Sequence, residues 1–162
     1  MKLSSGHVAL VTGASRGIGK AVAIRLGLAG ARVVVNYNSG QSEAGEVVNI
    51  INANGGEAIS LGADVTDEGQ VIAMVREVVE LWGRIDVLVN NAGIRKDKLL
   101  MRMTTAEWDS VIDTNLKGAY ICSKAALTHM VRQRRGRIIN MSSVIGLSGN
   151  PGQANYAASK SG

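Results

Sequence analysis

Phenylalanine is absent from this sequence of 162 residues, which also contains only one cysteine and one proline. The single cysteine, Cys122, excludes an internal disulfide and fits a reducing compartment. Its place in an apolar helical stretch favours a buried structural thiol over a nucleophile. Aromatic residues make up 3% of the chain, so the core must be built from Val, Ile, Leu, Ala and Met.

Long apolar runs are missing as well. No stretch approaches the length needed to span a membrane, and the N-terminal "MKLSSGHVALVTG" has no apolar segment followed by a cleavage site. We therefore expect a soluble cytoplasmic protein without a membrane partner. A plastid-like compartment would be the alternative if a transit peptide had been removed.

Metal and nucleic-acid signals are also lacking. The two histidines, His7 and His129, do not have metal-ligand spacing, so no metal site is expected. The net charge of +5 favours acidic partners, but it does not distinguish nucleic acid from a phosphate-bearing cofactor or an acidic protein. No nucleic-acid partner is expected, because the chain has no zinc spacing, no recognition-helix motif and no aromatic residues among its cations.

Glycine, in contrast, is abundant, with 20 residues that separate alternating strands and helices. Five runs rich in β-branched residues predict strands: "HVALVTG", "ARVVVNY", "EAISLGADV", "RIDVLVNNAG" and "GRIINMSSV". Helical spacing begins near Gly17, Gly40, Asp67, Thr104 and Gly118. Near-continuous apolar strands alternating with helices indicate a parallel sheet covered on both faces. The expected fold class is α/β, a doubly wound parallel sheet (Rossmann fold) in one domain over residues 1–162.

Local helix signals agree with this pattern. The helix expected after Asp67 starts with acidic residues and is followed by Gly83. Thr104 lies three residues before Glu107, which is the spacing of a capping box.

The first predicted strand leads through a glycine turn into a helix, in "VALVTGASRGIGKAVAIRL". Gly13, Gly17 and Gly19 follow a G-x-x-x-G-x-G spacing, which differs from the common G-x-G-x-x-G fingerprint but meets a similar need. Gly13 permits a sharp exit from the strand, Gly17 lets the backbone approach a diphosphate, and Gly19 allows close helix–strand packing. With unpaired N–H groups at the helix start, the stretch predicts a dinucleotide site.

The end of the second predicted strand indicates which dinucleotide binds. NAD sites usually have Asp or Glu there, whereas this strand ends in "VVVNYNSG", with Asn36 and Asn38 and no carboxylate. Arg16 in the glycine turn can instead meet a 2′-phosphate. The expected cofactor is therefore NADP(H).

"TGASRGIG", "NNAG" and a Y-x-x-x-K pair, Tyr156 and Lys160, occur in this order along the chain. With them the chain resembles the short-chain dehydrogenase/reductases over essentially all of its length. The stretches "LLMRM" and "GQANYAASK" narrow the resemblance to the β-ketoacyl-acyl carrier protein reductases of type II fatty acid synthesis. The resemblance implies an oxidoreductase that uses NADPH to reduce a β-ketoacyl thioester on acyl carrier protein to the β-hydroxyacyl thioester.

The resemblance also implies four catalytic residues. Tyr156 matches the acid that protonates the nascent alkoxide. Lys160, on the same helix face, matches the partner that favours the phenolate form and holds the nicotinamide ribose. Ser143 matches the serine that hydrogen-bonds the substrate carbonyl, and Asn115 matches the asparagine that holds a proton-relay water beside the lysine.

Further cofactor contacts follow from the resemblance. Asp64 and Val65 match the pair around adenine, and the "NNAG" residues lie where the cofactor passes the fourth strand. The full set of expected cofactor contacts is Thr12, Gly13, Ser15, Arg16, Gly17, Ile18, Gly19, Asn36, Asn38, Asp64, Val65, Asn91, Ala92, Gly93, Tyr156 and Lys160.

The basic stretch "MVRQRRGRIIN" surrounds a predicted helix end and has two explanations. Cations there face the negative end of the helix dipole, which alone can account for them. The resemblance implies instead that the acidic acyl carrier protein docks there. Arg134 is then the first candidate, and Arg95, Lys96, Lys98 and Arg102 are possible helpers near the cleft mouth.

The family pattern continues past Lys160 with a longer helix, further strands and a substrate-covering loop. We therefore expect a C-terminally truncated domain with five strands, in which the fifth strand is an exposed edge. The family's homotetramer would lose part of its interface. Two alternatives remain: a non-catalytic nucleotide-binding or interaction module, and a short-chain reductase acting on another ketone, such as acetoacetyl-CoA, a quinone or a sugar.

Overall fold

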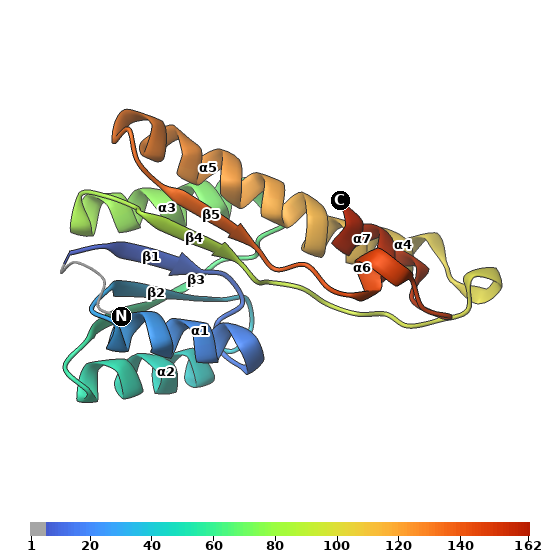
Figure 1. The fold of residues 1–162 in the computed structure, drawn as a ribbon, viewed down its shortest axis with the longest axis horizontal. Helices are drawn as coiled ribbons and strands as arrows, with labels where there is room; N and C mark the ends of the chain where they lie inside the picture. The colour runs from blue at the N-terminus through green and yellow to red at the C-terminus, as the bar shows by residue number, and fades with distance from the viewer. Residues whose placement is uncertain (1–5) are drawn as a thin grey trace.

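The computed structural model describes residues 6–162 and contains one parallel sheet in the order β3-β2-β1-β4-β5 (Figure 1). From β1 the chain moves outward to β2 and β3, and then returns to place β4 on the other side of β1. The carboxyl ends of β1 and β4 therefore border the crevice in which such sheets bind ligands. The strands are β1 (Val8–Val11), β2 (Arg32–Tyr37), β3 (Glu57–Gly62), β4 (Val87–Asn90) and β5 (Arg137–Asn140).

Helices cover both faces of the sheet, which confirms the predicted doubly wound fold (Figure 1). One face carries α1 (Gly17–Leu28) and α2 (Gln41–Ala53), and the other carries α3 (Glu68–Trp82) and α5 (Gly118–Arg132). All four residues of β1 are buried, as expected for a central parallel strand covered on both sides.

The core has two parts, one on each face of the sheet. Because successive strand residues point to opposite faces, Leu10 packs with α3 and α5 whereas Val11 packs with α1 and α2. Aliphatic side chains dominate both parts, as the missing phenylalanine predicts. Cys122 lies in the first part, where burial raises the pKa of its thiol to about 12. This is the buried structural thiol that the sequence predicts.

Each helix start that the sequence predicts lies within one residue of a helix start in the structure. Asp67 caps α3 by accepting a hydrogen bond from the Gln70 amide, and Gly83 ends that helix with a φ of 72°. The helix α4 (Thr105–Ile112) begins with the complete capping box of Thr104 and Glu107. The sequence pattern therefore locates these ends through their local chemistry.

Several short elements have no counterpart in the sequence pattern. They are η1 (Leu100–Arg102), the π-helix η2 (Asp113–Lys117) and α6 (Ile145–Ser148). With α4 and α7 (Ala154–Ser161) they gather beyond the carboxyl ends of β4 and β5 (Figure 1). Within residues 6–162, no helix is long and apolar enough to cross a membrane.

A charged cluster lies at the amino edge of the sheet. The carboxylate of Asp86 accepts hydrogen bonds from Arg84 at 2.8 and 2.7 Å and from the Val8 amide at 2.9 Å. The Nε atom of Arg135 lies 3.4 Å from the Oδ1 atom of Asp86. The Nη2 atom of Arg135 lies 2.6 Å from the Nε2 atom of His7. The cluster therefore joins the start of β1, the start of β4 and the α5–β5 turn.

Candidate active site

A crevice at the carboxyl edge of the sheet contains two adjoining cavities. The α7 cavity, of about 670 Å³, lies between α7, the end of β5 and the segment after β4. The glycine-turn cavity, of about 780 Å³, lies between the glycine turn and the ends of β2 and β3. The two form one elongated site, because five residues line both: Arg16, Ile18, Asn91, Gly93 and Ile94.

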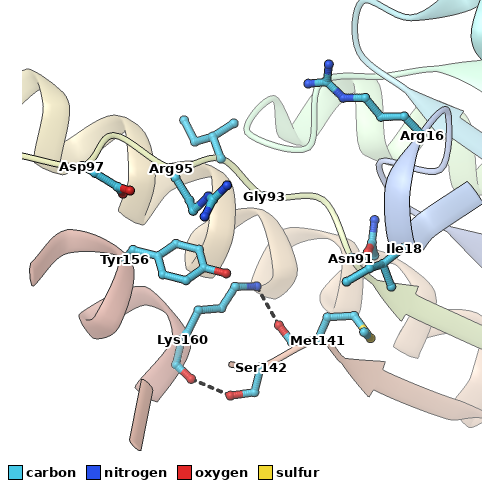
Figure 2. A pocket seen from close by; sticks show the side chains of 11 residues that line it. Arg16, Ile18, Asn91, Gly93, Arg95, Asp97, Met141, Ser142, Tyr156 and Lys160 are labelled. Atoms are coloured by element: carbon cyan, nitrogen blue, oxygen red, sulfur yellow. Dashed lines mark hydrogen bonds between the residues drawn. The ribbon is translucent and has the colours of Figure 1, made fainter. Parts of the chain in front are cut away.

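Tyr156 and Lys160 both line the α7 cavity (Figure 2). The Nζ atom of Lys160 donates a hydrogen bond to the Met141 carbonyl at 2.6 Å and lies 6.0 Å from the centroid of the Tyr156 ring. Burial lowers the pKa of Lys160 below its usual value. The spacing of four residues thus places a phenol and a partly desolvated ammonium on one face of α7, next to the same cavity.

Ser143 departs from the expectation. Its hydroxyl accepts a hydrogen bond from the Ile145 amide at 3.2 Å, at the start of α6. Ser142 lines the α7 cavity instead, and its hydroxyl donates to the Lys160 carbonyl at 2.8 Å. The Ser143 hydroxyl is thus occupied at the start of α6. The structure therefore does not bring Ser143 into the cavity with Tyr156 and Lys160.

Asn115, expected as a catalytic residue, lies in the π-helix η2 and is 6% exposed. Its Oδ1 atom accepts from the Ile94 amide at 2.8 Å, and its Nδ2 atom donates to the Ile94 carbonyl and to the Ser159 hydroxyl, both at 3.0 Å. Its amide therefore fixes the segment after β4 to α7. A π-bulge inside a helix is often found at a functional site.

The segment after β4, residues 93–99, is attached to the start of α7 by further bonds. The fully buried Asn155 donates to the Lys96 carbonyl at 3.0 Å, and Gln153 donates to the Asp97 carboxylate at 3.0 Å. The Lys98 amide donates to the Gly152 carbonyl at 2.7 Å. These bonds hold residues 93–99 in register with the helix that carries Tyr156.

Asn155→Ala tests this attachment. The substitution leaves the partly buried Lys96 carbonyl and Tyr156 amide without their bonds to the Asn155 side chain. We expect it to lower the free energy of unfolding by about 2 kcal/mol, measured by urea denaturation. Asn54→Ala, at the exposed end of α2, is the control and should cost less than about 1 kcal/mol. Equal losses would contradict a special role for Asn155.

Lys98 also forms an ion pair of 2.8 Å with Glu107 of the capping box. The hydrogen bond from Lys98 and those from Thr104 lower the pKa of Glu107 to about 2. The start of α4 is thereby tied to the same segment.

The glycine turn has the geometry that its spacing predicts. Gly13 has a φ of 61°, and a Cβ atom there would lie 2.9 Å from the Ala92 Cα atom. A Cβ atom on Gly19 would overlap the Asn91 side chain and the Gly13 carbonyl. Gly17, in contrast, has a φ of 57°, and a Cβ atom there would meet nothing within 4 Å. The backbone at the start of α1 is therefore open to a ligand.

Thr12 and Asn91 join β1 to the end of β4. The Thr12 hydroxyl accepts hydrogen bonds from the amides of Asn91 and Ala92, both at 3.0 Å. The Asn91 side chain donates to the carbonyls of Thr12 at 2.9 Å and Gly13 at 3.0 Å. Thr12, expected to contact the cofactor, is 1% exposed and lines neither cavity, because its hydroxyl is used to position the "NNAG" turn.

Asn36 lies at the glycine-turn cavity but is 1% exposed, and its amide is occupied by backbone. Its Oδ1 atom accepts from the Gly13 amide at 3.2 Å, while its Nδ2 atom donates to the carbonyls of Leu61 at 3.2 Å and Ala63 at 3.1 Å. Asn36 therefore supports the glycine turn from the ends of β2 and β3. The sequence shows only that a carboxylate is missing at this position.

Asp64 lies at the same cavity with a stable negative charge. It accepts hydrogen bonds from the Thr66 amide at 2.9 Å, the Thr66 hydroxyl at 2.8 Å and Asn38 at 3.0 Å. The bond from the Thr66 amide is the main cause that keeps the pKa of Asp64 below its usual value. Four more expected contacts, Ser15, Val65, Ala92 and Gly93, line this cavity too.

The basic residues separate into two groups. Arg134, with a φ of 55°, lies in the α5–β5 turn at the amino edge, at the other end of β5 from the α7 cavity. Arg95 lines the α7 cavity itself. Within one chain, Arg134 therefore does not border the crevice. Among the described residues, no group of three His, Cys, Asp or Glu could hold a metal ion.

One feature of the site is missed by sequence reasoning. Asn155 is fully buried next to Tyr156, although a polar residue at the start of a helix is usually exposed. No periodicity or spacing marks this residue. Arg95, expected near the cleft mouth as a helper in carrier-protein docking, lines the α7 cavity.

The sequence profile of the short chain dehydrogenase family matches residues 7–162. A 3-oxoacyl-(acyl-carrier-protein) reductase, FabG of Staphylococcus aureus strain Mu50, is 55% identical over 154 residues, covering 95% of this chain and 63% of that protein. The Synechocystis reductase of the same name is 52% identical and covers 100% of this chain and 66% of that protein. A crystal structure of a provisionally assigned short-chain alcohol dehydrogenase from Sinorhizobium meliloti 1021 superposes with a TM-score of 0.94 at 40% identity, covering 99% of this chain and 63% of that one. The chain thus spans less than two thirds of the length of these relatives.

Proposed function

This chain belongs to the short-chain dehydrogenase family, and on that premise we propose that it carries out the NADPH-dependent reduction of a 3-oxoacyl thioester, held by an acyl carrier protein, to the 3-hydroxyacyl thioester. The single observation that carries the proposal is the pairing of Tyr156 with Lys160 on one wall of the α7 cavity. The 55% identity to a 3-oxoacyl-(acyl-carrier-protein) reductase supports the choice of substrate.

The residues of the crevice fit a dinucleotide. Backbone approaches closely at Gly13 and Gly19, and the open backbone at Gly17 exposes the start of α1 to a diphosphate. Asp64 lies at the adenine end, and Arg16 lines both cavities, where it can meet a 2′-phosphate. Tyr156 and Lys160 lie at the other end of the crevice. The distribution favours a nicotinamide cofactor with its ring in the α7 cavity.

In the proposed reaction, bound NADPH supplies the hydride. Tyr156 donates its phenolic proton to the carbonyl oxygen of the substrate as negative charge develops there. The Lys160 ammonium, held on the Met141 carbonyl, stabilises the phenolate that remains. Asn115 and Asn155 keep α7 and the segment after β4 in fixed positions, so that proton donor and substrate stay aligned.

The cofactor preference gives the first test. We expect NADPH oxidation, followed by absorbance, with an acetoacetyl group on acyl carrier protein and with a small acetoacetyl thioester, at rates well above those with NADH. Arg16→Ala should weaken NADPH binding about tenfold and leave NADH binding within about twofold, since a charge-assisted hydrogen bond to a phosphate is lost.

The matched control is Arg25→Ala, in the last turn of α1 and outside both cavities. It should leave the dissociation constants of both cofactors unchanged. Preference for NADH would reject the cofactor assignment, and failure to reduce any 3-oxoacyl thioester in the presence of bound NADPH would reject the reaction.

A further inference from the structure

Arg95 is the cation of the α7 cavity that the proposed reaction leaves unused. Figure 2 shows its side chain entering the cavity from the segment after β4, on the side of Tyr156 and Lys160. Within residues 6–162, its guanidinium forms no hydrogen bond or ion pair. The side chain is exposed, so its five N–H donors are available to a ligand.

The backbone on both sides of Arg95 is fixed. The amide and carbonyl of Ile94 are bonded to the buried side chain of Asn115, and the carbonyl of Lys96 is bonded to the fully buried Asn155. Because Asn155 precedes Tyr156 in the chain, these bonds hold the Cα atom of Arg95 in a set relation to the phenol. The backbone that carries this cation is thus held in place, and the guanidinium can act as a second binding point for a substrate.

The charge of the cavity favours a ligand rich in oxygen. Three cations line it, Arg16, Arg95 and Lys160, against one carboxylate. That carboxylate, Asp97, accepts a hydrogen bond of 3.0 Å from Gln153. Arg16 lies at the end of the cavity shared with the glycine turn, and Lys160 is bonded to the Met141 carbonyl. Arg95 is left as the free donor beside Tyr156.

We propose that Arg95 binds a second oxygen of the substrate, so that the cavity selects 1,3-dicarbonyl compounds: Tyr156 contacts the reacting C3 oxygen and Arg95 contacts the oxygen on C1. This inference rests on the proposed function, whose substrate carries both oxygens, and it assigns the recognition of the C1 oxygen to Arg95. A thioester carbonyl and a free carboxylate both present such an oxygen. An isolated ketone does not, and a guanidinium can bond either acceptor through two parallel N–H groups.

The test uses Arg95→Met, which keeps an unbranched side chain but removes all five donors. With a small acetoacetyl thioester, kcat/KM should fall about 10- to 100-fold, mainly through KM. With 2-pentanone, which lacks the C1 oxygen, it should change less than about twofold. Arg95→Lys should recover part of the loss, and Arg76→Met, an exposed cation on α3, should change neither substrate.

A binding measurement separates this inference from the proposed function. Malonate carries two oxygen-bearing groups in the 1,3 relation and cannot be reduced, so its dissociation constant, measured by calorimetry with NADP⁺ present, does not depend on turnover. Arg95→Met should weaken malonate binding about tenfold, and Arg76→Met should leave it unchanged. If the unmodified protein reduces no ketone but malonate binding depends on Arg95 in this way, the proposed function fails, whereas the role of Arg95 as a binding point for the second oxygen holds.

The opposite results overturn the inference. They are an equal loss of kcat/KM for the thioester and for 2-pentanone, an unchanged kcat/KM for the thioester, or malonate binding that is absent or insensitive to Arg95→Met. If the thioester is reduced normally in the variant, the proposed function stands while Arg95 has no part in substrate selection.

Discussion

Tyr156→Phe should lower kcat by about three orders of magnitude and leave the dissociation constant of NADPH within about twofold. The substitution keeps the ring on the wall of the α7 cavity and removes only the hydroxyl, which we propose as the proton donor. Single-turnover reduction of an acetoacetyl thioester, with cofactor binding followed separately by fluorescence, would separate the chemical step from binding.

Tyr120→Phe is the matched control, because Tyr120 is 61% exposed on α5. It should change kcat by less than about twofold. If the Tyr156 variant keeps more than about a tenth of kcat, the proton comes from another group of the cavity, of which the Ser142 hydroxyl is the first to test.

Asp86→Ala should lower the free energy of unfolding by about 3 kcal/mol at pH 7, measured by urea denaturation. The Asp86 side chain is 3% exposed, and its removal leaves the Val8 amide and the partly buried Arg84 guanidinium without their acceptor. The effect should appear in stability rather than in kcat, since the cluster lies at the opposite edge of the sheet from the crevice.

The same carboxylate predicts a dependence on pH. Burial by itself would raise the pKa of Asp86, but the hydrogen bonds from Arg84 and the Val8 amide outweigh it and hold the pKa below its usual value. The stabilisation is therefore complete above about pH 4 and is lost as the pH falls through the lowered pKa. The difference in stability between the unmodified protein and Asp86→Ala should narrow in that acid range.

Asp109→Ala, on the exposed side of α4, is the control for the loss of stability and should cost less than about 0.5 kcal/mol at any pH. An equal cost for Asp86→Ala and Asp109→Ala at pH 7 would contradict the predicted role of Asp86.

Much of the fold can be predicted because its signals are local. Thr104 and Glu107 satisfy each other at the start of α4, and Gly83 adopts the left-handed conformation after α3, so each marks its boundary without help from distant parts of the chain. The glycine turn is also predicted by a local signal. Its spacing reflects close backbone approaches at Gly13 and Gly19 that any larger residue would prevent.

The candidate site is less predictable, because it depends on which atom of a polar side chain finds which partner. Asn36 is expected to contact the cofactor, and it lines the glycine-turn cavity, but its amide is bonded to backbone and supports the glycine turn. The resemblance places Ser143 at the substrate carbonyl, whereas its hydroxyl is turned to the start of α6. Asn115 and Asn155 bond the backbone on either side of Arg95, which lines the α7 cavity, and neither bond is visible in the sequence.

The side chain of Asn91 has a further consequence for nucleotide binding. Its two bonds to the end of β1 span the boundary between the halves of the sheet, so the floor of the crevice is a single bonded surface before any ligand arrives. Folding has already restricted the motion of this floor. Nucleotide binding at the glycine turn should therefore not have to supply the free energy of ordering it.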